Sequence, residues 1–365
     1  MTESIHNPRP TIHVLAAASF ALLASACSNV GYYAQTVSGQ LNIWGRERPI
    51  EEVIADPNSP QVLKERLARV TEIRDFASRE LALPDNRSYK SYVDLERPFV
   101  VWNVFAAPEF SVQPMQWCLL FAGCVSYRGY FSKEEAERFA STLAGNDVYI
   151  GGVPAYSTLG YFDDPVLNTF INYPPYEVAR LLFHELAHQV AYAKDDSVFN
   201  ESFAVTVEQE GLRRWLAKNG DERQRESVER AQRVRGEFIG MIERYRGRLA
   251  ALYRTRIAPD AMREKKREIL AEFAAEYQTK RKSAEWGGFA GYDRFFAISP
   301  NNAQLASVAI YTRLVPQFEA LLAREGGDLG RFYAAVKELA ALPKDERYAQ
   351  LGAPSAPAGN ESQRR

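Results

Sequence analysis

The sequence predicts an α+β fold that is mostly helical. Three observations support this prediction: apolar residues recur at helical spacing over most of the chain, one central stretch is β-rich, and a long charged segment has the pattern of a helical hairpin. The 365 residues are enough to bury a substantial core in one large domain or two. The net charge of −1 gives no electrostatic reason to expect nucleic acid as a partner.

Residues 1–26 have the features of an export signal. A short apolar core covers residues 12–24, and Arg9 is the only lysine or arginine before it. Three small residues then precede Cys27, as at a lipoprotein processing site, so we expect Cys27 to be lipidated. Cleavage without lipidation and an uncleaved anchor are the alternatives, although the apolar run is short for an anchor. Ser28 follows the cysteine, which resembles the sorting pattern for the outer membrane.

The segment 27–50 is polar and aromatic, and we expect it to be a linker between the membrane and the folded body. Turn residues follow at 56–60. Apolar residues then recur at helical spacing from residue 61 to about residue 81, which predicts a helix.

The β-rich region comes next. Strands are predicted at 98–106, within 117–131 and at 148–152. Between the last two, Ser132 has the spacing of a capping box and begins a helix that runs to about Leu143.

Two cysteines remain once Cys27 is set aside. Cys118 and Cys124 are an even pair in a chain that we expect to be exported, which favours a disulfide. Two buried thiols are the open alternative, because the segment WCLLFAGC is strongly apolar.

The helix around which the chain is organised carries the pattern H-E-x-x-H. Pro175 suits its first turn, and His184, Glu185 and His188 follow. Residues four apart lie on one face of a helix, so both imidazoles can point at one ion and Glu185 can reach a water beside that ion. The chain has four histidines, and the other two fall in the predicted signal. The alternative is a buried helix whose two histidines are merely hydrogen-bonded.

A catalytic zinc site usually has three protein ligands and one open position. Glu201 is the best candidate for the third ligand, because turn-like residues at 194–197 allow a second helix to fold back against the first. Glu208 lies on the same face of that second helix, and we expect it to support the ligands from behind or, as the alternative, to be the ligand itself. The sequence therefore predicts a Zn²⁺ site of His184, His188 and Glu201.

The remainder of the chain is helical in pattern. Residues 221–283 are dense in charge and predict two long antiparallel helices, with a solvated face and no sign of chemistry. We expect residues 284–345 to form a C-terminal helical part, in which Asn301 or Asn302 caps an apolar helix that continues through Val315. Residues 346–365 are predicted to be a disordered tail.

Four segments also carry a resemblance: HELAHQ, FNESFA, YRGYF and NNAQLA. Together they resemble a family of zinc aminopeptidases found among Gram-negative bacterial lipoproteins, over most of the chain from about Cys27 to beyond Tyr311. More loosely, the motif is similar to the gluzincin metallopeptidases, in which a glutamate on the next helix is the third zinc ligand. The spacing from His188 to Glu201 is shorter than in the thermolysin-like pattern, and no G-A-M-E-N-type motif is present.

The resemblance implies a peptidase core at residues 51–220, a peptide substrate and a lipid-anchored location in the periplasm. It also implies that an edge strand near residues 152–157 pairs with the substrate backbone. Such an enzyme needs a donor for the developing oxyanion, and the candidates are Tyr156, Arg128, Asn302 and Tyr311. An aminopeptidase also needs an acid for the substrate ammonium, and the candidates are Glu208, Asp163 and Asp164.

Two other functions stay open at this point. An endopeptidase or a cell-wall peptide hydrolase could use the same zinc chemistry. A non-catalytic envelope protein with a structural metal would use the helical hairpin as its working surface, and its ion would need a fourth protein ligand.

Overall fold

The computed structural model describes residues 31–119 and 123–353. The chain divides into two compact units, Met1–Arg46 and Glu47–Arg365. In the first unit, residues 31–44 are helical, although the sequence had assigned them to a linker. The predicted signal and Cys27 lie outside the described residues. Within the described ranges, no helix combines the length and the apolar character needed to cross a membrane.

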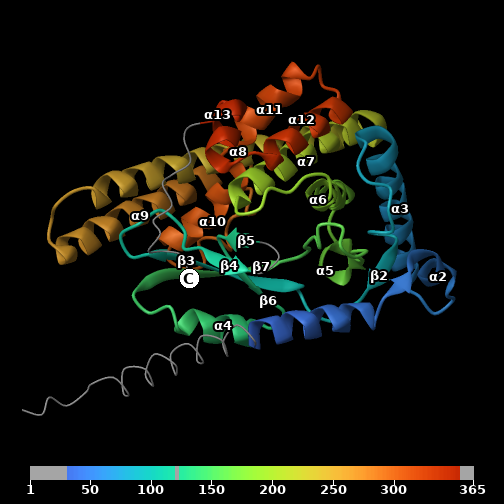
Figure 1. Cartoon of the computed structure of the whole chain (residues 1–365), viewed down its shortest axis with the longest axis horizontal. Coiled ribbons are helices and arrows are strands. Elements are labelled where there is room, and N and C mark those ends of the chain that lie inside the picture. The colour runs from blue at the N-terminus through green and yellow to red at the C-terminus, as the bar shows by residue number, and fades with distance from the viewer. Residues whose placement is uncertain (1–30, 120–122, 354–365) are drawn as a thin grey trace, which may run out of the picture. The chain divides into compact units, whose positions relative to one another are not determined.

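The second unit is an α+β fold in which helices predominate, as the sequence predicts. Figure 1 shows a small sheet region beside a larger helical part. The strands are β1 (Arg48–Pro49), β2 (Ser91–Val93), β3 (Val101–Pro108), β4 (Trp117–Leu119), β5 (Gly123–Val125), β6 (Arg128–Tyr130), β7 (Asn146–Val153) and β8 (Val166–Leu167). The helices are α2 (Ile50–Ala55), α3 (Gln61–Leu81), α4 (Lys133–Ser141), α5 (Asn168–Ile171), α6 (Pro175–His188), α7 (Ser197–Asn219), α8 (Glu222–Tyr253), α9 (Pro259–Arg281), α10 (Asn302–Thr312), α11 (Val315–Arg324), α12 (Leu329–Ala341) and α13 (Lys344–Leu351).

The main sheet has the strand order β6-β3-β7, and both pairings are antiparallel. Among the described residues β7 pairs only with β3, so β7 is an edge strand. Helix α10 covers one face through Phe105 and Ala107 of β3, and α4 covers the other face, where Tyr130 packs on Phe139. The sheet is therefore covered on both faces but open along β7.

Two smaller strand groups complete the β region. Strand β2 lies between β1 and β8, and β4 pairs with β5. A disulfide joins Cys118 to Cys124 across β4 and β5, which answers the question that the sequence left open for these cysteines.

Helices α6 and α7 pack closely against each other. A side chain at Gly211 of α7 would bring its Cβ to 2.7 Å from the ring of Phe183 on α6, so glycine permits this approach. The same Cβ would lie 2.8 Å from Leu81 at the end of α3. The helix that carries the H-E-x-x-H motif is thus held between α3 and α7.

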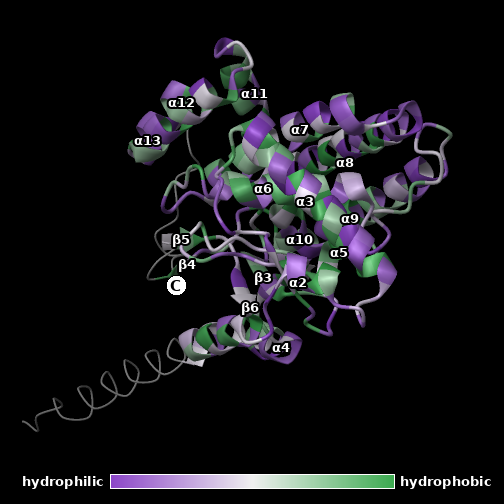
Figure 2. Ribbon diagram, turned by 90° about the vertical axis from the view of Figure 1, so that its right-hand side faces the viewer, coloured by the Kyte–Doolittle hydropathy of each residue, from purple (hydrophilic) through white to green (hydrophobic). Residues whose placement is uncertain are grey.

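Helices α8 and α9 form the predicted charged hairpin. Ion pairs Arg244–Glu276 and Lys280–Glu237 join them in antiparallel order. Phe238, Phe273 and Trp286 lie in the core between the hairpin and the segment that follows it. Hydrophilic residues recur along α8 and α9 in Figure 2, as expected for helices with one solvated face.

The C-terminal helices depart from the prediction in two places. The apolar helix expected to continue through Val315 ends at Thr312, and α11 begins at Val315 with a proline in its first turn. The tail predicted from residue 346 is also wrong at its start, because residues 346–351 belong to α13 and Tyr348 is fully buried.

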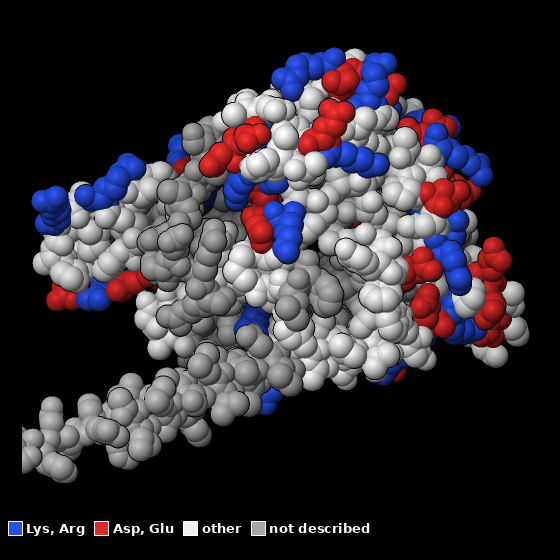
Figure 3. Space-filling view, viewed as in Figure 1, with Lys and Arg blue, Asp and Glu red and all other residues white. Residues whose placement is uncertain are grey.

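Basic and acidic side chains are intermingled over the C-terminal helices and over α3 on the face shown in Figure 3.

Candidate metal centre

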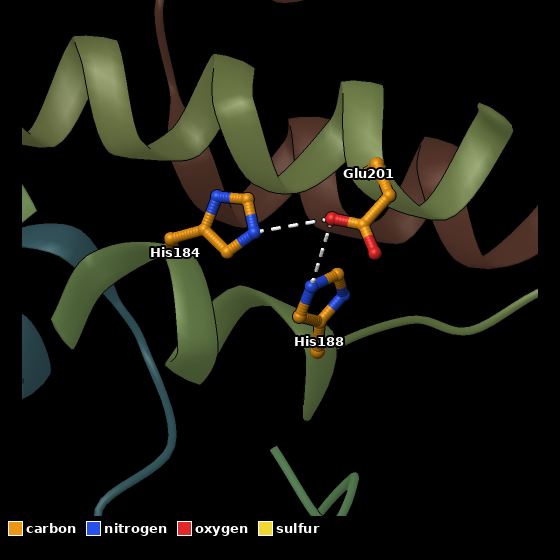
Figure 4. A group of neighbouring side chains, drawn as sticks. All are labelled: His184, His188 and Glu201. Atoms are coloured by element: carbon orange, nitrogen blue, oxygen red, sulfur yellow. Dashed lines mark hydrogen bonds and ion pairs between the residues drawn. The ribbon is translucent and has the colours of Figure 1, made fainter. Parts of the chain in front are cut away.

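His184, His188 and Glu201 converge on one point between α6 and α7. Glu201 Oε2 lies 3.2 Å from His184 Nε2 and 3.6 Å from His188 Nε2. Figure 4 shows both rings directed at this single carboxylate oxygen. The three ligand atoms all lie within 4.8 Å of one another, and all three residues are buried.

The ligands are ionisable side chains in a buried position, and their neighbours shift the pKa values of His184 and Glu201. Burial alone would lower the pKa of His184, but hydrogen bonds to Glu201 and Glu208 outweigh it and raise that pKa to about 10. Burial would raise the pKa of Glu201, but the two histidines outweigh it and lower that pKa to about 2. The two glutamates thus favour a protonated His184, and the ring must give up a proton to bind a metal ion.

Glu208 holds His184 from behind. Its Oε2 lies 2.9 Å from His184 Nδ1, so an Nδ1–H donating to Glu208 leaves Nε2 free to face an ion. Its Oε1 accepts hydrogen bonds from Arg180 at 2.7 Å and from Arg235 at 2.8 Å. Burial would raise the pKa of Glu208, but the two arginines hold it well below its usual range. Glu208 thus contacts the ring nitrogen of His184 that faces away from Glu201.

Glu185 lies on α6, directly after His184, and it is buried. The residue is 7% exposed, and burial raises the pKa of its carboxyl group. Asp164 is also buried, and desolvation raises its pKa to about 7. Burial thus makes both carboxyl groups hold a proton more readily than an exposed carboxyl does.

The turn between α6 and α7 sets the position of Glu201. Asp196 caps α7 by accepting a hydrogen bond from the backbone of Phe199 at 3.3 Å. The side chain of Asn200 bonds both the N–H and the C=O of Ala193, at 2.7 and 2.9 Å. These bonds fix the first turn of α7 and therefore the start of the helix that carries Glu201.

The α13 helix and the disulfide hairpin also contact this turn. The carboxylate of Asp196 is fully buried and pairs with Arg347 of α13 at 2.6 Å. On another side, the backbone N–H of Cys124 donates to the side chain of Asp195. Elements far apart in the sequence thus hold the connection between the ligand helices.

The three side chains could hold a metal ion. Two imidazoles and one carboxylate are a recurring ligand set for zinc that keeps an open position. Within residues 31–119 and 123–353, no fourth histidine, cysteine or acid joins the group. His188 faces the ligand point through Nε2, and its buried Nδ1 has no hydrogen-bond partner.

A cavity of about 1250 Å³ lies beside the ligand group. Gly151, Gly152 and Val153 of the edge strand β7 line it, as do Glu208 and Tyr311. Residues of α8, the first helix of the hairpin, and of the segment 289–295 also line this cavity. None of the three ligands lines the cavity itself; Glu208, which contacts His184, and Tyr311 connect it to them.

Tyr311, one of the oxyanion candidates, lies beside the ligand His184. Its ring centroid is 6.3 Å from that of His184. Burial holds the pKa of its hydroxyl well above the usual value, so the group stays protonated and can donate a hydrogen bond.

The other candidates lie elsewhere. Arg128 stacks on Phe139 on the α4 face of the sheet, opposite the face covered by α10. The Asn302 amide donates to the carbonyl of Glu109 and accepts from Tyr253, so it joins the hairpin to the sheet. Asn301 is the residue that caps α10. Tyr156 packs against Phe131 after the end of β7.

The three ammonium candidates have different surroundings in the structure. Glu208 is fully engaged by His184 and two arginines, and Asp163 is exposed beside Arg87. Asp164 accepts a hydrogen bond from the backbone of Thr158.

Sequence reasoning missed the two arginines that hold Glu208. Arg180 lies four residues before His184, and helical spacing on the motif helix could have found it. Arg235 belongs to the charged hairpin, which contains many arginines, and nothing in the sequence distinguishes it as the one that contacts Glu208.

One family model, described as "putative aminopeptidase", matches residues 31–351. No match to the chain was found among the curated proteins or among the solved structures.

Proposed function

The chain belongs to this putative aminopeptidase family, and from that premise we propose that it is a zinc-dependent peptidase of the aminopeptidase type. The observation that carries the proposal is the convergence of His184, His188 and Glu201 from two packed helices. The same motif supplies Glu185 next to the ligands. Three protein ligands without a fourth favour catalysis over a structural metal.

The residues of the chain have distinct roles in this proposal. When bound, Zn²⁺ would polarise the peptide carbonyl and lower the pKa of a nearby water toward about 7. Glu185 takes the proton of that water and passes it to the leaving amine. Tyr311 donates a hydrogen bond to the developing oxyanion. Glu208 fixes the ring of His184, and the open edge of β7 binds the substrate backbone.

The test of this mechanism is Glu185→Gln. The substitution keeps the shape of the side chain but removes its ability to accept the proton, so peptide hydrolysis should fall by at least about a hundredfold. Metal content, measured on the purified protein by elemental analysis, should stay the same because Glu185 is not a ligand. A variant as active as the parent would show that another group is the base.

The choice of exopeptidase is tested with the same protein. Peptides with a free amino terminus should be cleaved, and their N-acetylated counterparts should not. Equal cleavage of both would instead assign an endopeptidase or a cell-wall peptide hydrolase.

We also propose that the protein acts in the periplasm, anchored through a lipid on Cys27. The support is the apolar segment 12–24 and the small residues before Cys27. Membrane fractionation of cells that produce the full chain tests this, since protein found only in the soluble periplasmic fraction would exclude the anchor.

A further inference from the structure

Two arginines converge where the cavity approaches the metal centre. Arg180 and Arg235 both donate through Nη1 to the same oxygen, Glu208 Oε1. Arg180 comes from the motif helix α6, whereas Arg235 comes from the hairpin helix α8. Both side chains line the cavity, and each is 29% exposed, whereas Glu208 behind them is 2% exposed.

Both arginines line the cavity and have donors that their carboxylate contacts do not use. Arg180 uses Nε on Glu177 and Nη1 on Glu208. Within the described residues, the one carboxylate that pairs with Arg235 is that of Glu208. A guanidinium carries more N–H donors than these contacts use, and its planar fork matches a carboxylate.

The position of the pair suits contact with a peptide. Only the Glu208 carboxylate and the His184 ring separate each guanidinium from the point on which the ligands converge. The edge strand β7 and Tyr311 line the same cavity. Its volume of about 1250 Å³ leaves room for several residues of a bound chain.

We infer that Arg180 and Arg235 form a binding site for a carboxylate of the substrate, so that the preferred substrates are peptides with a carboxylate a few residues at most from the bond that is cleaved. This inference rests on the proposed peptidase function. The carboxylate is either the C-terminus of a short peptide or an acidic side chain, and the chemistry at the two guanidinium groups is the same for both.

The inference is tested by binding, because binding does not depend on turnover. Calorimetry on the Glu185→Gln protein compares two matched pairs of short peptides. One pair differs only in a free or amidated C-terminus, and the other has glutamate or glutamine at one position. A carboxylate peptide should bind about tenfold or more tightly than its neutral partner, as expected for charge-assisted hydrogen bonds. The pair that shows the preference identifies the source of the carboxylate.

Arg235→Gln, added to the Glu185→Gln protein, should remove most of this preference, and Arg235→Lys should keep part of it. The matched control is Arg213→Gln. Arg213 lines the same cavity, but it pairs with Glu210 and not with Glu208. This control should bind all four peptides as the parent does.

Two results would overturn the inference: equal binding of both members of each pair, which includes no binding at all, or a preference that survives Arg235→Gln. A role limited to holding Glu208 predicts a different pattern, in which Arg235→Gln lowers metal content and weakens both members of a pair equally. If the parent hydrolyses no peptide, the proposed function fails, but the binding comparison still decides the role of the arginines.

Discussion

His184 is held from two sides, because each of its ring nitrogens faces a glutamate. Glu201 lies on the Nε2 side of the ring and Glu208 on the Nδ1 side. Glu208 is itself fixed by Arg180 and Arg235. The ring therefore has one orientation, with Nε2 facing the ion position, before any ion binds.

Glu208→Gln should weaken metal binding. The amide cannot supply the negative charge that the two arginines and the His184 Nδ1–H now share, and loss of such a support typically costs about 10- to 100-fold in metal affinity. Competition with a zinc chelator of known affinity measures the change. The control is Glu210→Gln, because Glu210 lies on the same helix and pairs with arginines but contacts no histidine. Equal affinity of the Glu208 variant and the parent would contradict this role.

The sequence could predict the ligands but not their supports. His184, Glu185 and His188 are recognisable because their spacing on one helix is enough to place them together. Glu201 required only the assumption that the next helix folds back. Arg235 could not be predicted, because its contact with Glu208 depends on how the hairpin packs on α7. Arg128 was chosen for its residue type and Asn302 through the resemblance of its segment, and the contacts described above join them to other parts of the fold.

At the level of elements, the turn before α7 is held by the C-terminal helix α13. Asp196 caps α7 and has no exposed side-chain surface. Arg347, Tyr348 and Lys344 of α13 all approach its carboxylate. A buried charge of this kind is stable only while its partners remain.

Arg347→Ala should lower the free energy of unfolding by about 3 kcal/mol, because it leaves a buried carboxylate with weaker partners. Urea denaturation of the variant and the parent measures this difference. Arg331→Ala is the control: Arg331 also pairs with an aspartate that caps a helix, Asp328, but its side chain is 63% exposed. That substitution should cost less than about 1 kcal/mol. Similar losses for both variants would contradict the role given to burial.

The start of the tail was misjudged because α13 has little local signal. The helix is short and polar, and only Tyr348 and Leu351 are buried apolar residues in it. Its stability comes from contacts with Asp196, which is distant in the sequence. The longer helices were predictable since their apolar periodicity extends over many turns.

For the whole molecule, the sequence predicted the class of fold but not its arrangement. Periodicity identified a β region before the motif helix and a charged hairpin after it. The position of β7 at the sheet edge and the placement of the hairpin beside the cavity depend on pairings between distant segments. Such pairings are not encoded in the spacing of residues along one element.

Metal removal should lower the thermal stability of the whole second unit, since the ligands join two of its central helices. An ion that binds only the folded state stabilises it by about 4 kcal/mol when its free concentration is a thousand times its Kd. Calorimetry with and without a chelator measures the shift in Tm. Glu201→Gln should show a smaller shift because it loses one ligand. If the parent is purified with bound metal and the chelator leaves its Tm unchanged, the ion does not contribute to folding in this way.

The ion pair between Asp196 and Arg347 joins a turn in the middle of the chain to a helix near its C-terminal end. A ribosome releases the motif helix well before it has made α13, since synthesis runs from the N-terminus. The nascent chain then has both histidines but lacks Arg347, which pairs with Asp196 in the turn before Glu201. The turn before Glu201 therefore gains its full set of contacts only after α13 has been made and has packed against it.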